Sequence, residues 1–358
     1  NGMYKRSNII MMDKCFNEIE ISHFRGFDYI KIANLTKLNV FVGSNNVGKS
    51  SILEAVFMLS GMSNPIMPAR INYWRIPSAN NMNSTRYLFH NIDLNNRPML
   101  LARSDARIRR LTFYPFQQNN AVPSSDDTSM SSDIKQLNFD FDTKEEGVFS
   151  YHATLFTDLS GVLQQTVDAN YKEDLNCLFI PADKNDTNAT NNFATLVKRN
   201  KKQIVIDALK EFDPRIESIE ALPDGLYLAM KGVHELLPIS MAGDGARRMI
   251  NIISSIASED YNIVMIDEFD NGLHYSAHKL MWKILLKFIE NRNIQLFVTT
   301  HNIECIQSLK TVLQNDETLQ DLANVYNIVS TKLKGFQAYK YSFNELKEAI
   351  NNEIEIRQ

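Results

Sequence analysis

The sequence predicts an α/β fold in which a mixed core sheet is flanked by helices, with an inserted antiparallel β subdomain and a helical lobe. Three apolar runs that end in glycine-rich or polar residues predict this fold: 38–50, 262–268 and 295–301. Short apolar runs bounded by turn residues are typical of buried strands, and helical repeats lie between them. Strands that alternate with helices indicate a sheet covered by helices.

Residues 43–50 match the phosphate-loop pattern G-x-x-x-x-G-K-[ST]. An apolar strand at 38–42 precedes the loop and a helical repeat at 50–60 follows it, so a helix N-terminus would face an anion. Lys49 would reach the β- and γ-phosphates of a nucleotide, and Ser50 would coordinate Mg²⁺. A glycine turn that matches by chance is the alternative, and both flanking elements disfavour it. The residues expected to contact the nucleotide here are Gly43, Asn45, Asn46, Gly48, Lys49, Ser50 and Ser51.

The run at 262–268 ends in two carboxylates. Asp267 would hold Mg²⁺, through water, and Glu268 would polarise the water that attacks a phosphate. A strand that ends in a solvated acidic turn is the alternative. The run at 295–301 ends in His301, which would contact the γ-phosphate or the water, or would serve as a structural hydrogen-bonding residue.

Composition sets broad limits on the 358-residue chain. A formal net charge of −4 argues against a globally basic nucleic-acid coat but allows a local basic groove. Three distant cysteines suit a reducing compartment and form no CxxC pair. No apolar run approaches the length that spans a bilayer, and the first residues lack the regions of a signal peptide. We therefore expect a cytoplasmic protein without a membrane partner.

The remaining elements follow from local patterns. Alternating residues predict strands at 18–24 and 27–32 and, in the insertion, at 110–116, 135–141 and 148–156. A return strand at 178–180 precedes a long helix at 194–212, which Asp213-Pro214 ends. The turn Pro223-Asp224-Gly225 predicts a hairpin. Further predicted elements are helices at 243–257 and 276–291, strands at 325–330 and 337–341, and a terminal helix from Asn344.

These patterns predict three regions. A head would comprise 13–61 and 178–342, interrupted by a mainly β subdomain at 62–177, and a C-terminal helix would occupy 343–358. The segment 117–133 is rich in Ser, Asn and Asp and is expected to be a mobile loop.

Four motifs at a joint spacing resemble the RecF and overcoming-lysogenisation-defect (OLD) group of ATP-binding-cassette (ABC) type ATPases. A Phe-Arg-Gly-Phe turn at 24–27 leads to the phosphate loop, 266–274 resembles the Walker B and D-loop run, and 295–302 resembles the switch-histidine segment. The resemblance covers 13–61 and 178–342. It implies an ABC-type ATPase head that uses ATP and Mg²⁺, with Glu268, His301 and Lys49 as catalytic residues and with Ser50 and Asp267 at the metal.

The stretch 240–248 departs from the wider ABC signature, because a serine followed by paired glycines is absent. Its Gly-Asp-Gly followed by arginines resembles the OLD-like form. The resemblance implies that two heads stack head to tail around ATP. A glycine-flanked helix cap is the alternative for this stretch, and an exposed, salt-bridging arginine is the alternative for each arginine below. The residues that the resemblance brings to the nucleotide are Gly243, Gly245, Arg247 as an arginine finger, Asp270 and the early Arg25.

OLD-type proteins often carry a metal-dependent nuclease domain after the head. Few residues follow His301, so we expect an ATPase head without that domain. The pair Asp140 and Asp142 lies on an alternating strand and is interpreted as a solvated face.

Two basic clusters leave nucleic-acid binding open. One is 198–202, on a predicted helix, and solvated faces are the alternative for both. If they lined one groove, they would contact DNA phosphates. The second cluster consists of Arg103, Arg107, Arg109 and Arg110.

The favoured function is an ATPase that acts as a sensor or scaffold for a separate effector protein, in bacterial antiphage defence. The alternative is a DNA-binding repair or recombination ATPase of the RecF kind. A transporter subunit is disfavoured by the missing signature serine, and a non-hydrolysing nucleotide-binding protein is disfavoured by Glu268. The expected partners are a second copy of the chain, in a homodimer or higher oligomer, and the effector; DNA is possible.

Overall fold

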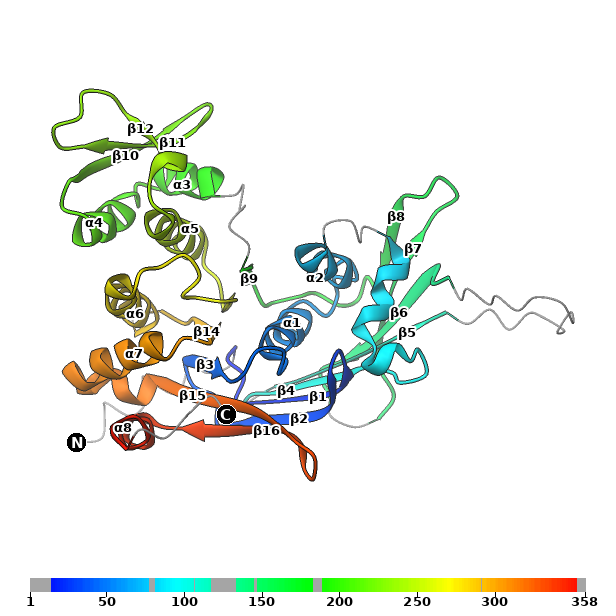
Figure 1. Cartoon of the computed structure of the whole chain (residues 1–358). Helices are drawn as coiled ribbons and strands as arrows, with labels where there is room; N and C mark the ends of the chain where they lie inside the picture. Colours follow the sequence, from blue (N-terminus) through cyan, green and yellow to red (C-terminus); the bar gives the residue numbers. More distant parts are fainter. Residues whose placement is uncertain are drawn as a thin grey trace, which may run out of the picture. The chain divides into compact units, whose positions relative to one another are not determined.

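A computed structural model describes residues 14–76, 81–105, 107–116, 133–144, 147–182, 189–290 and 292–352. The chain divides into two compact units (Figure 1). The first unit comprises Asn1–Leu35, Asn46–Leu175 and Ile328–Ala338, and the second comprises Thr36–Asn45, Asn176–Asn327 and Tyr339–Gln358. The division passes through the phosphate loop, between its third and fourth residues.

The first unit is built on a seven-stranded sheet of order β2-β1-β4-β5-β6-β7-β8. Neighbouring strands are antiparallel throughout. Ile21 of β1 lies opposite both Ile30 and Leu100, and all three are fully buried. The strands are β1 (Glu18–Phe24), β2 (Phe27–Ala33), β4 (Met99–Arg103), β5 (Ile108–Pro115), β6 (Gln136–Asp142), β7 (Tyr151–Thr157) and β8 (Leu163–Val167).

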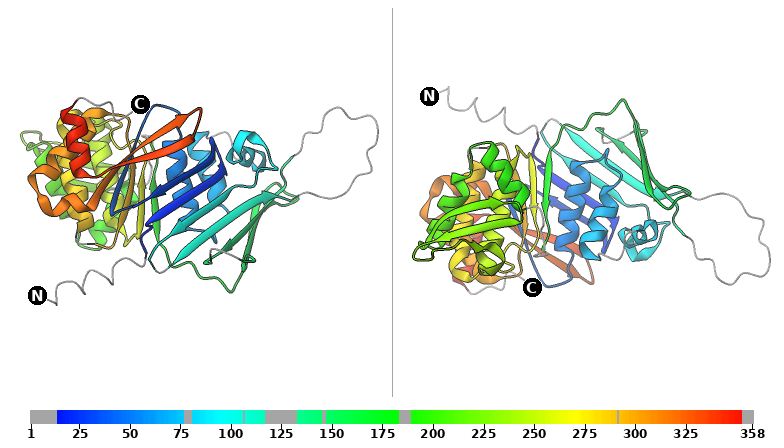
Figure 2. Two further views of the ribbon diagram at one scale, coloured as in Figure 1. Left: turned by 90° about the horizontal axis from the view of Figure 1, so that it is seen from below. Right: turned by 90° about the horizontal axis from the view of Figure 1, so that it is seen from above.

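Helix α1 (Lys49–Ser60) packs on β1, β4 and β5 and covers one face of this sheet (Figure 2). Ten of its residues, Ser51–Ser60, are buried, because the sheet lies on one side of the helix and α2 (Met67–Arg75) packs on another. Two short 3₁₀ helices, η1 (Met82–Leu88) and η2 (His90–Ile92), follow α2. The helix that begins at the phosphate loop is therefore held rigidly in the first unit.

A second sheet has the order β16-β15-β3-β14-β13-β9 and belongs to the second unit, except that residues 328–331 of β15 and 335–338 of β16 are assigned to the first unit. The five strands from β15 to β9 are parallel. β3, β13 and β14 are buried along their whole length, as their apolar sequences predict. The strands are β3 (Leu38–Val42), β9 (Cys177–Ile180), β13 (Ile263–Ile266), β14 (Gln295–Thr299), β15 (Ala323–Thr331) and β16 (Gly335–Tyr341).

Six α-helices, two 3₁₀ helices and a small sheet complete the described part of the second unit. Helix α5 packs on α3 and α4, and α6 packs on α7, where the indole of Trp282 donates a hydrogen bond to the carbonyl of Cys305. The helices are α3 (Ala189–Lys198), α4 (Gln203–Phe212), α5 (Asp244–Ser258), α6 (Tyr275–Glu290), α7 (Ile303–Asn315) and α8 (Phe343–Asn351). The small sheet has the order β10-β11-β12, from Ile216–Leu222, Gly225–Met230 and Leu237–Pro238. The 3₁₀ helix η3 (Ile239–Met241) precedes α5, and the 3₁₀ helix η4 (Glu317–Leu322) follows α7.

The mixed α/β fold expected from the sequence is confirmed, but three details differ. The helix predicted at 194–212 is two helices, because Asn200 adopts a left-handed φ of 55° and ends α3. The inserted strands are antiparallel, as expected, yet they continue the sheet of β1 and β2 and form one unit with them. The sequence patterns did not predict β4, β8 and α7. Residues 117–132 of the expected mobile loop lie outside the described residues.

Candidate nucleotide-binding site

The phosphate loop has the backbone of an anion site. It leaves the buried strand β3 at Gly43, whose φ is 143°, and it enters α1 through Gly48, whose φ is 98°. Asn46 also adopts a positive φ, of 64°, and its side chain is exposed. Alternation between left-handed and ordinary backbone angles turns successive N–H groups toward one point. The loop and the first turn of α1 can therefore cradle phosphate oxygens.

Gly48 is also required by a close neighbour. An added Cβ would lie 2.5 Å from Cζ of Phe27, the last residue of the Phe-Arg-Gly-Phe turn. The ring of Phe27 in turn contacts Phe336 edge to face, with centroids 4.8 Å apart. The turn therefore packs against the phosphate loop through the ring of Phe27.

Arg25 of the same turn points toward α1. Its Nε donates to Oε2 of Glu54 at 2.9 Å, and Nε of Arg75 donates to Oε1 of the same carboxylate at 2.5 Å. Side-chain exposure is 11% for Arg25 and 4% for Glu54, so this salt bridge is buried, not exposed. Burial lowers the pKa of Arg25, and Glu54 opposes that shift. An approach of Arg25 to the nucleotide stays a prediction.

The acidic pair follows β13 and is fixed by the neighbouring strand. Oγ1 of Thr299, the last residue of β14, donates to Oδ1 of Asp267 at 2.6 Å and accepts from the backbone N–H of Glu268 at 2.8 Å. Glu268 has a left-handed φ of 45°, which a non-glycine residue adopts at a cost of roughly 1–2 kcal/mol. Strain of this kind is concentrated at functional sites.

The next threonine holds the D-loop. Oγ1 of Thr300 donates to Oδ1 of Asp270 at 2.6 Å and accepts from the N–H of Asn302 at 3.1 Å. Both Thr300 and Asp270 are buried, whereas His301, which lies between Thr300 and Asn302 in the sequence, is exposed. The carboxylate of Asp270 thus binds a residue of its own chain. The expected role of Asp270 at a seam between two heads stays a prediction.

These acidic and polar residues meet at one edge of the second unit's sheet. β3, β14 and β13 are adjacent and parallel, so their carboxyl ends lie side by side. Gly43, Thr299 and Asp267 follow or end those three strands. Sequence reasoning found the glycine and the acid but missed both threonines, because a hydroxyl at a strand end gives no motif by itself.

The start of α5 has an open helix N-terminus. Gly243 caps it, and no described atom lies within 4 Å of where a Cβ on Gly243 would be. A Cβ on Gly245 would lie 3.3 Å from Phe212 and 3.6 Å from the carbonyl oxygen of Gly272 in the D-loop. Arg247, half-exposed, forms an ion pair with Asp244 in the same turn.

Comparison with known proteins identifies the fold and activity class. Residues 16–146 and 127–306 match the AAA ATPase domain family. The chain belongs to this family. An ATP/GTP phosphatase of Helicobacter pylori (strain ATCC 700392 / 26695) is 26% identical over 332 residues, which cover 84% of this chain and 88% of the relative. The protein is therefore an ATPase with the phosphate loop of this family.

Other matches are local or have a TM-score below 0.5. The DNA replication and repair protein RecF of Streptococcus pyogenes serotype M5 (strain Manfredo) is 42% identical over 43 residues, 12% of each chain. An SMC head bound to the C-winged helix domain of ScpA covers 94% of this chain and 99% of its own, at 11% identity and a TM-score of 0.48. The SMC head domain from Thermotoga maritima has a TM-score of 0.39 over 91% of this ATPase and 99% of its own chain, also at 11% identity.

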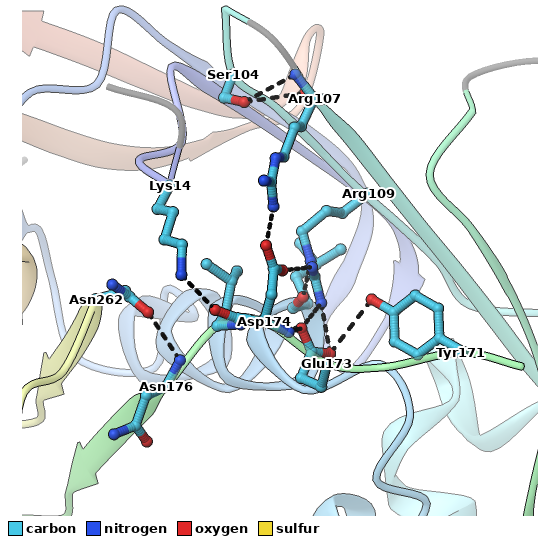
Figure 3. A network of polar contacts seen from close by, with 11 residues as sticks. Lys14, Ser104, Arg107, Arg109, Tyr171, Glu173, Asp174, Asn176 and Asn262 are labelled. Carbon is cyan, nitrogen blue, oxygen red and sulfur yellow. Dashed lines mark hydrogen bonds and ion pairs between the residues drawn. The ribbon is translucent and has the colours of Figure 1, made fainter. Parts of the chain in front are cut away.

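The arginine cluster of the AAA ATPase does not form a free basic surface. Arg107 pairs with Asp174, and Arg109 donates to Glu173 at 2.7 and 2.8 Å and to the carbonyl of Leu59 at 2.6 Å (Figure 3). The other two arginines are also paired. Arg103 binds Glu18 and Glu20, and Arg110 lies 3.9 Å from Asp142 and over the ring of Phe149. These charges stabilise the sheet and the end of α1, so the predicted contribution of this cluster to a DNA groove is not supported.

The interpretation of Asp140 and Asp142 as a solvated face is wrong for one of them. Asp142 is 1% exposed and accepts from the hydroxyl of Ser150 at 3.2 Å. Asp140 is partly exposed and is held by Tyr114 and His152. Both carboxylates are therefore engaged in the first unit's sheet.

The donors suit Mg²⁺ better than a softer metal. Within the described ranges, no group of three or more His, Cys, Asp or Glu side chains could hold a metal ion. Mg²⁺ needs no such group, because one or two protein oxygens, substrate phosphates and water complete its shell. Asp267 has a carboxylate fixed by Thr299, and Ser50 offers a hydroxyl in the first turn of α1.

No helix of the described segments has the length and apolar character needed to cross a membrane.

Proposed function

We propose that this ATPase binds and hydrolyses ATP as a head-to-tail homodimer or higher oligomer, in the manner of OLD- and RecF-like ATPases. The observation that carries the proposal is the open N-terminus of α5 at Gly243, with Gly245 in the first turn lying close to the carbonyl oxygen of Gly272 in the D-loop. A glycine-flanked helix N-terminus favours an anion, so it suits the γ-phosphate of a nucleotide held by a second head. The adjacent D-loop would then line the same seam.

Each site residue has one role in this proposal. Lys49 and the N–H groups of the phosphate loop bind the β- and γ-phosphates, and Ser50 and Asp267 hold Mg²⁺, which would neutralise charge on those phosphates. Glu268 accepts the proton of the attacking water. His301, which is exposed, contacts the γ-phosphate or the water. Arg247 leaves Asp244 and adds positive charge when the heads close.

A complementation experiment tests the composite site. Gly243→Glu would place a carboxylate where the partner's phosphate binds, and Lys49→Ala would remove the loop cation, so each variant alone should be inactive. A mixed dimer has one doubly defective and one intact site. An equal mixture should regain roughly a quarter of the parental rate, because half of randomly formed dimers are mixed. Mixed dimers that form, as shown by mass, and hydrolyse no ATP would contradict the head-to-tail arrangement.

We further propose that the closed dimer recruits or releases a separate effector protein in a bacterial, cytoplasmic defence module. The support is the OLD-like form of 240–248 and the engagement of Asp140 and Asp142, the D-x-D pair of the sequence, in structural contacts with Tyr114 and Ser150. Native purification of the parent and of Glu268→Gln should yield a stoichiometric partner whose amount differs between the two. Equal recovery, or none, would argue against the scaffold role.

The alternative is a DNA-binding ATPase of the RecF kind. The local similarity to RecF and the turn between α3 and α4 favour it, since Lys198, Lys201 and Lys202 show no ion pair among the described residues. This reading expects DNA to stimulate hydrolysis in a salt-dependent manner. Lys201→Glu with Lys202→Glu should then abolish the stimulation while the rate without DNA is kept.

A further inference from the structure

A buried arginine on α5 holds the backbone of the acidic pair. Arg248 is 6% exposed, in contrast to its neighbour Arg247, which is half-exposed. Its Nη1 donates to the carbonyl oxygen of Pro181 at 3.0 Å. Its Nη2 donates to the carbonyl oxygens of Asp267 at 2.8 Å and Glu268 at 3.3 Å. One guanidinium therefore contacts the peptide groups on both sides of Glu268.

These contacts complete a set of bonds around a strained residue. The N–H of Glu268 is held by Thr299 at 2.8 Å, and the carbonyls before and after its Cα are held by Arg248. The left-handed φ of 45° at Glu268 costs free energy, so it persists only where surrounding contacts fix it. We infer that Arg248 is a positioning residue for hydrolysis: its guanidinium fixes the backbone of Glu268 so that the carboxylate faces the attacking water. The inference rests on the role proposed above for Glu268.

The chemistry explains why an arginine stands here. A guanidinium carries its donors in a planar, rigid fork, so it can reach three carbonyl oxygens at once, and a lysine ammonium has no such fixed geometry. Hydrogen bonds to a charged donor are also stronger than neutral ones. Because Arg248 lies in the second turn of α5, which Gly243 caps, the same contacts join that helix to the acidic pair of its own chain.

The matched control is Arg199, which also donates to a carbonyl, that of Ser258, at the other end of α5 and at 2.5 Å. Arg248→Gln and Arg248→Lys should bind ATP with parental affinity and turn it over about 100-fold more slowly, the effect of misplacing a catalytic group by an ångström. Arg199→Gln should keep the parental turnover. Parental turnover in Arg248→Gln, weakened ATP binding, or an equal loss of turnover in Arg199→Gln would each overturn the inference.

A double variant separates positioning from a general loss of structure. When Glu268 is already glutamine, the hydrogen bonds of Arg248 have no catalytic base to position. Adding Arg248→Gln to that variant should therefore leave the residual hydrolysis rate unchanged. A further fall in that rate would show that Arg248 acts on the fold and would overturn the inference. Parental turnover in the single variant Glu268→Gln would instead refute the role of Glu268. That variant leaves Arg248 unchanged, so this result is distinct from a failure of the inference on Arg248.

Discussion

The ring of Phe27 occupies the space in which a side chain at position 48 would lie. A Cβ on Gly48 would meet Cζ of Phe27 at 2.5 Å, and Gly48 has a φ of 98° that side chains rarely adopt. The Phe-Arg-Gly-Phe turn thus packs against the phosphate loop, although residues 28–42 lie between the two motifs in sequence. This contact gives a physical reason for the two motifs to occur together.

We predict that Gly48→Ala strongly weakens ATP binding. The left-handed backbone alone costs about 1–2 kcal/mol, and the clash with Phe27 displaces either the loop or the ring. Gly26→Ala is the control, because no described atom lies within 4 Å of the added Cβ and the φ of Gly26 is not left-handed. Nucleotide affinity measured by fluorescence should fall for Gly48→Ala only. Equal affinities for both variants would show that the loop does not need its glycine.

Lys49→Ala should abolish ATP binding. Lys49 is the cation of the phosphate loop, and the loop's N–H groups alone carry only partial charges. Lys49→Arg is the informative companion, since it keeps the charge but not the compact ammonium. Isothermal titration with ATP and Mg²⁺ checks both variants, and parental affinity in Lys49→Ala would remove the phosphate-loop assignment.

Local sequence signals predicted the elements that build the site but not the contacts between them. β3, β13 and β14 are apolar and short, and α1 and α5 begin at glycines, so their positions follow from composition and spacing. α7 was not predicted, although Asn302 caps it by accepting from the N–H groups of Glu304 and Cys305. Its buried residues also recur at helical spacing: Cys305, Ile306, Leu309, Val312 and Leu313. The single helix predicted at 194–212 failed because a left-handed Asn200 has no strong signal.

Partners of long side chains also lie beyond the reach of local patterns. Arg247 and Arg248 are adjacent in sequence, yet one faces Asp244 and the other is buried against Walker B carbonyls. Likewise, the arginines of β4 and β5 resemble a basic cluster in sequence, because the carboxylates that pair with them come from β1, β6 and residues 173–174. The run of arginines therefore predicted a basic surface. The ion pairs in the folded structure show that these arginines have carboxylate partners instead.

We predict that Glu54→Gln lowers the free energy of unfolding by about 3–5 kcal/mol, because removing one partner of a buried ion pair leaves the other charge uncompensated. Arg25 is that other charge, and it is largely buried. Arg75→Gln is the control: the Arg75 side chain is 42% exposed, so its loss should cost less than about 1 kcal/mol. Urea unfolding measures both variants, and similar values for the two would contradict a buried pair.

His278 should make the stability fall in mild acid. Its side chain is fully buried, and burial lowers its pKa below 6.5; the carboxylates of Asp270 and Glu304 oppose this shift, whereas His274 adds to it. A depressed folded pKa gives stability that is present above the unfolded pKa and is lost as the pH falls through the folded pKa. Tm should therefore drop between about pH 7.5 and pH 5.5. His278→Leu should show a smaller drop, and an unchanged pH dependence would remove His278 as its cause.

Substitutions of Glu268 and Asp267 should affect different steps: the first should slow ATP hydrolysis, and the second should weaken ATP binding. Glu268→Gln keeps the size of the side chain but cannot accept a proton, so turnover should fall by roughly 10²–10⁴-fold while the affinities for ATP and Mg²⁺ are kept. ATP-bound dimer should then accumulate and appear as a larger species in size-exclusion chromatography. Asp267→Asn should instead weaken the Mg²⁺-dependent binding of ATP, because it removes the charge that Thr299 orients. Glu268→Gln with parental turnover would mean that another group activates the water, and the exposed His301 would be the first to test.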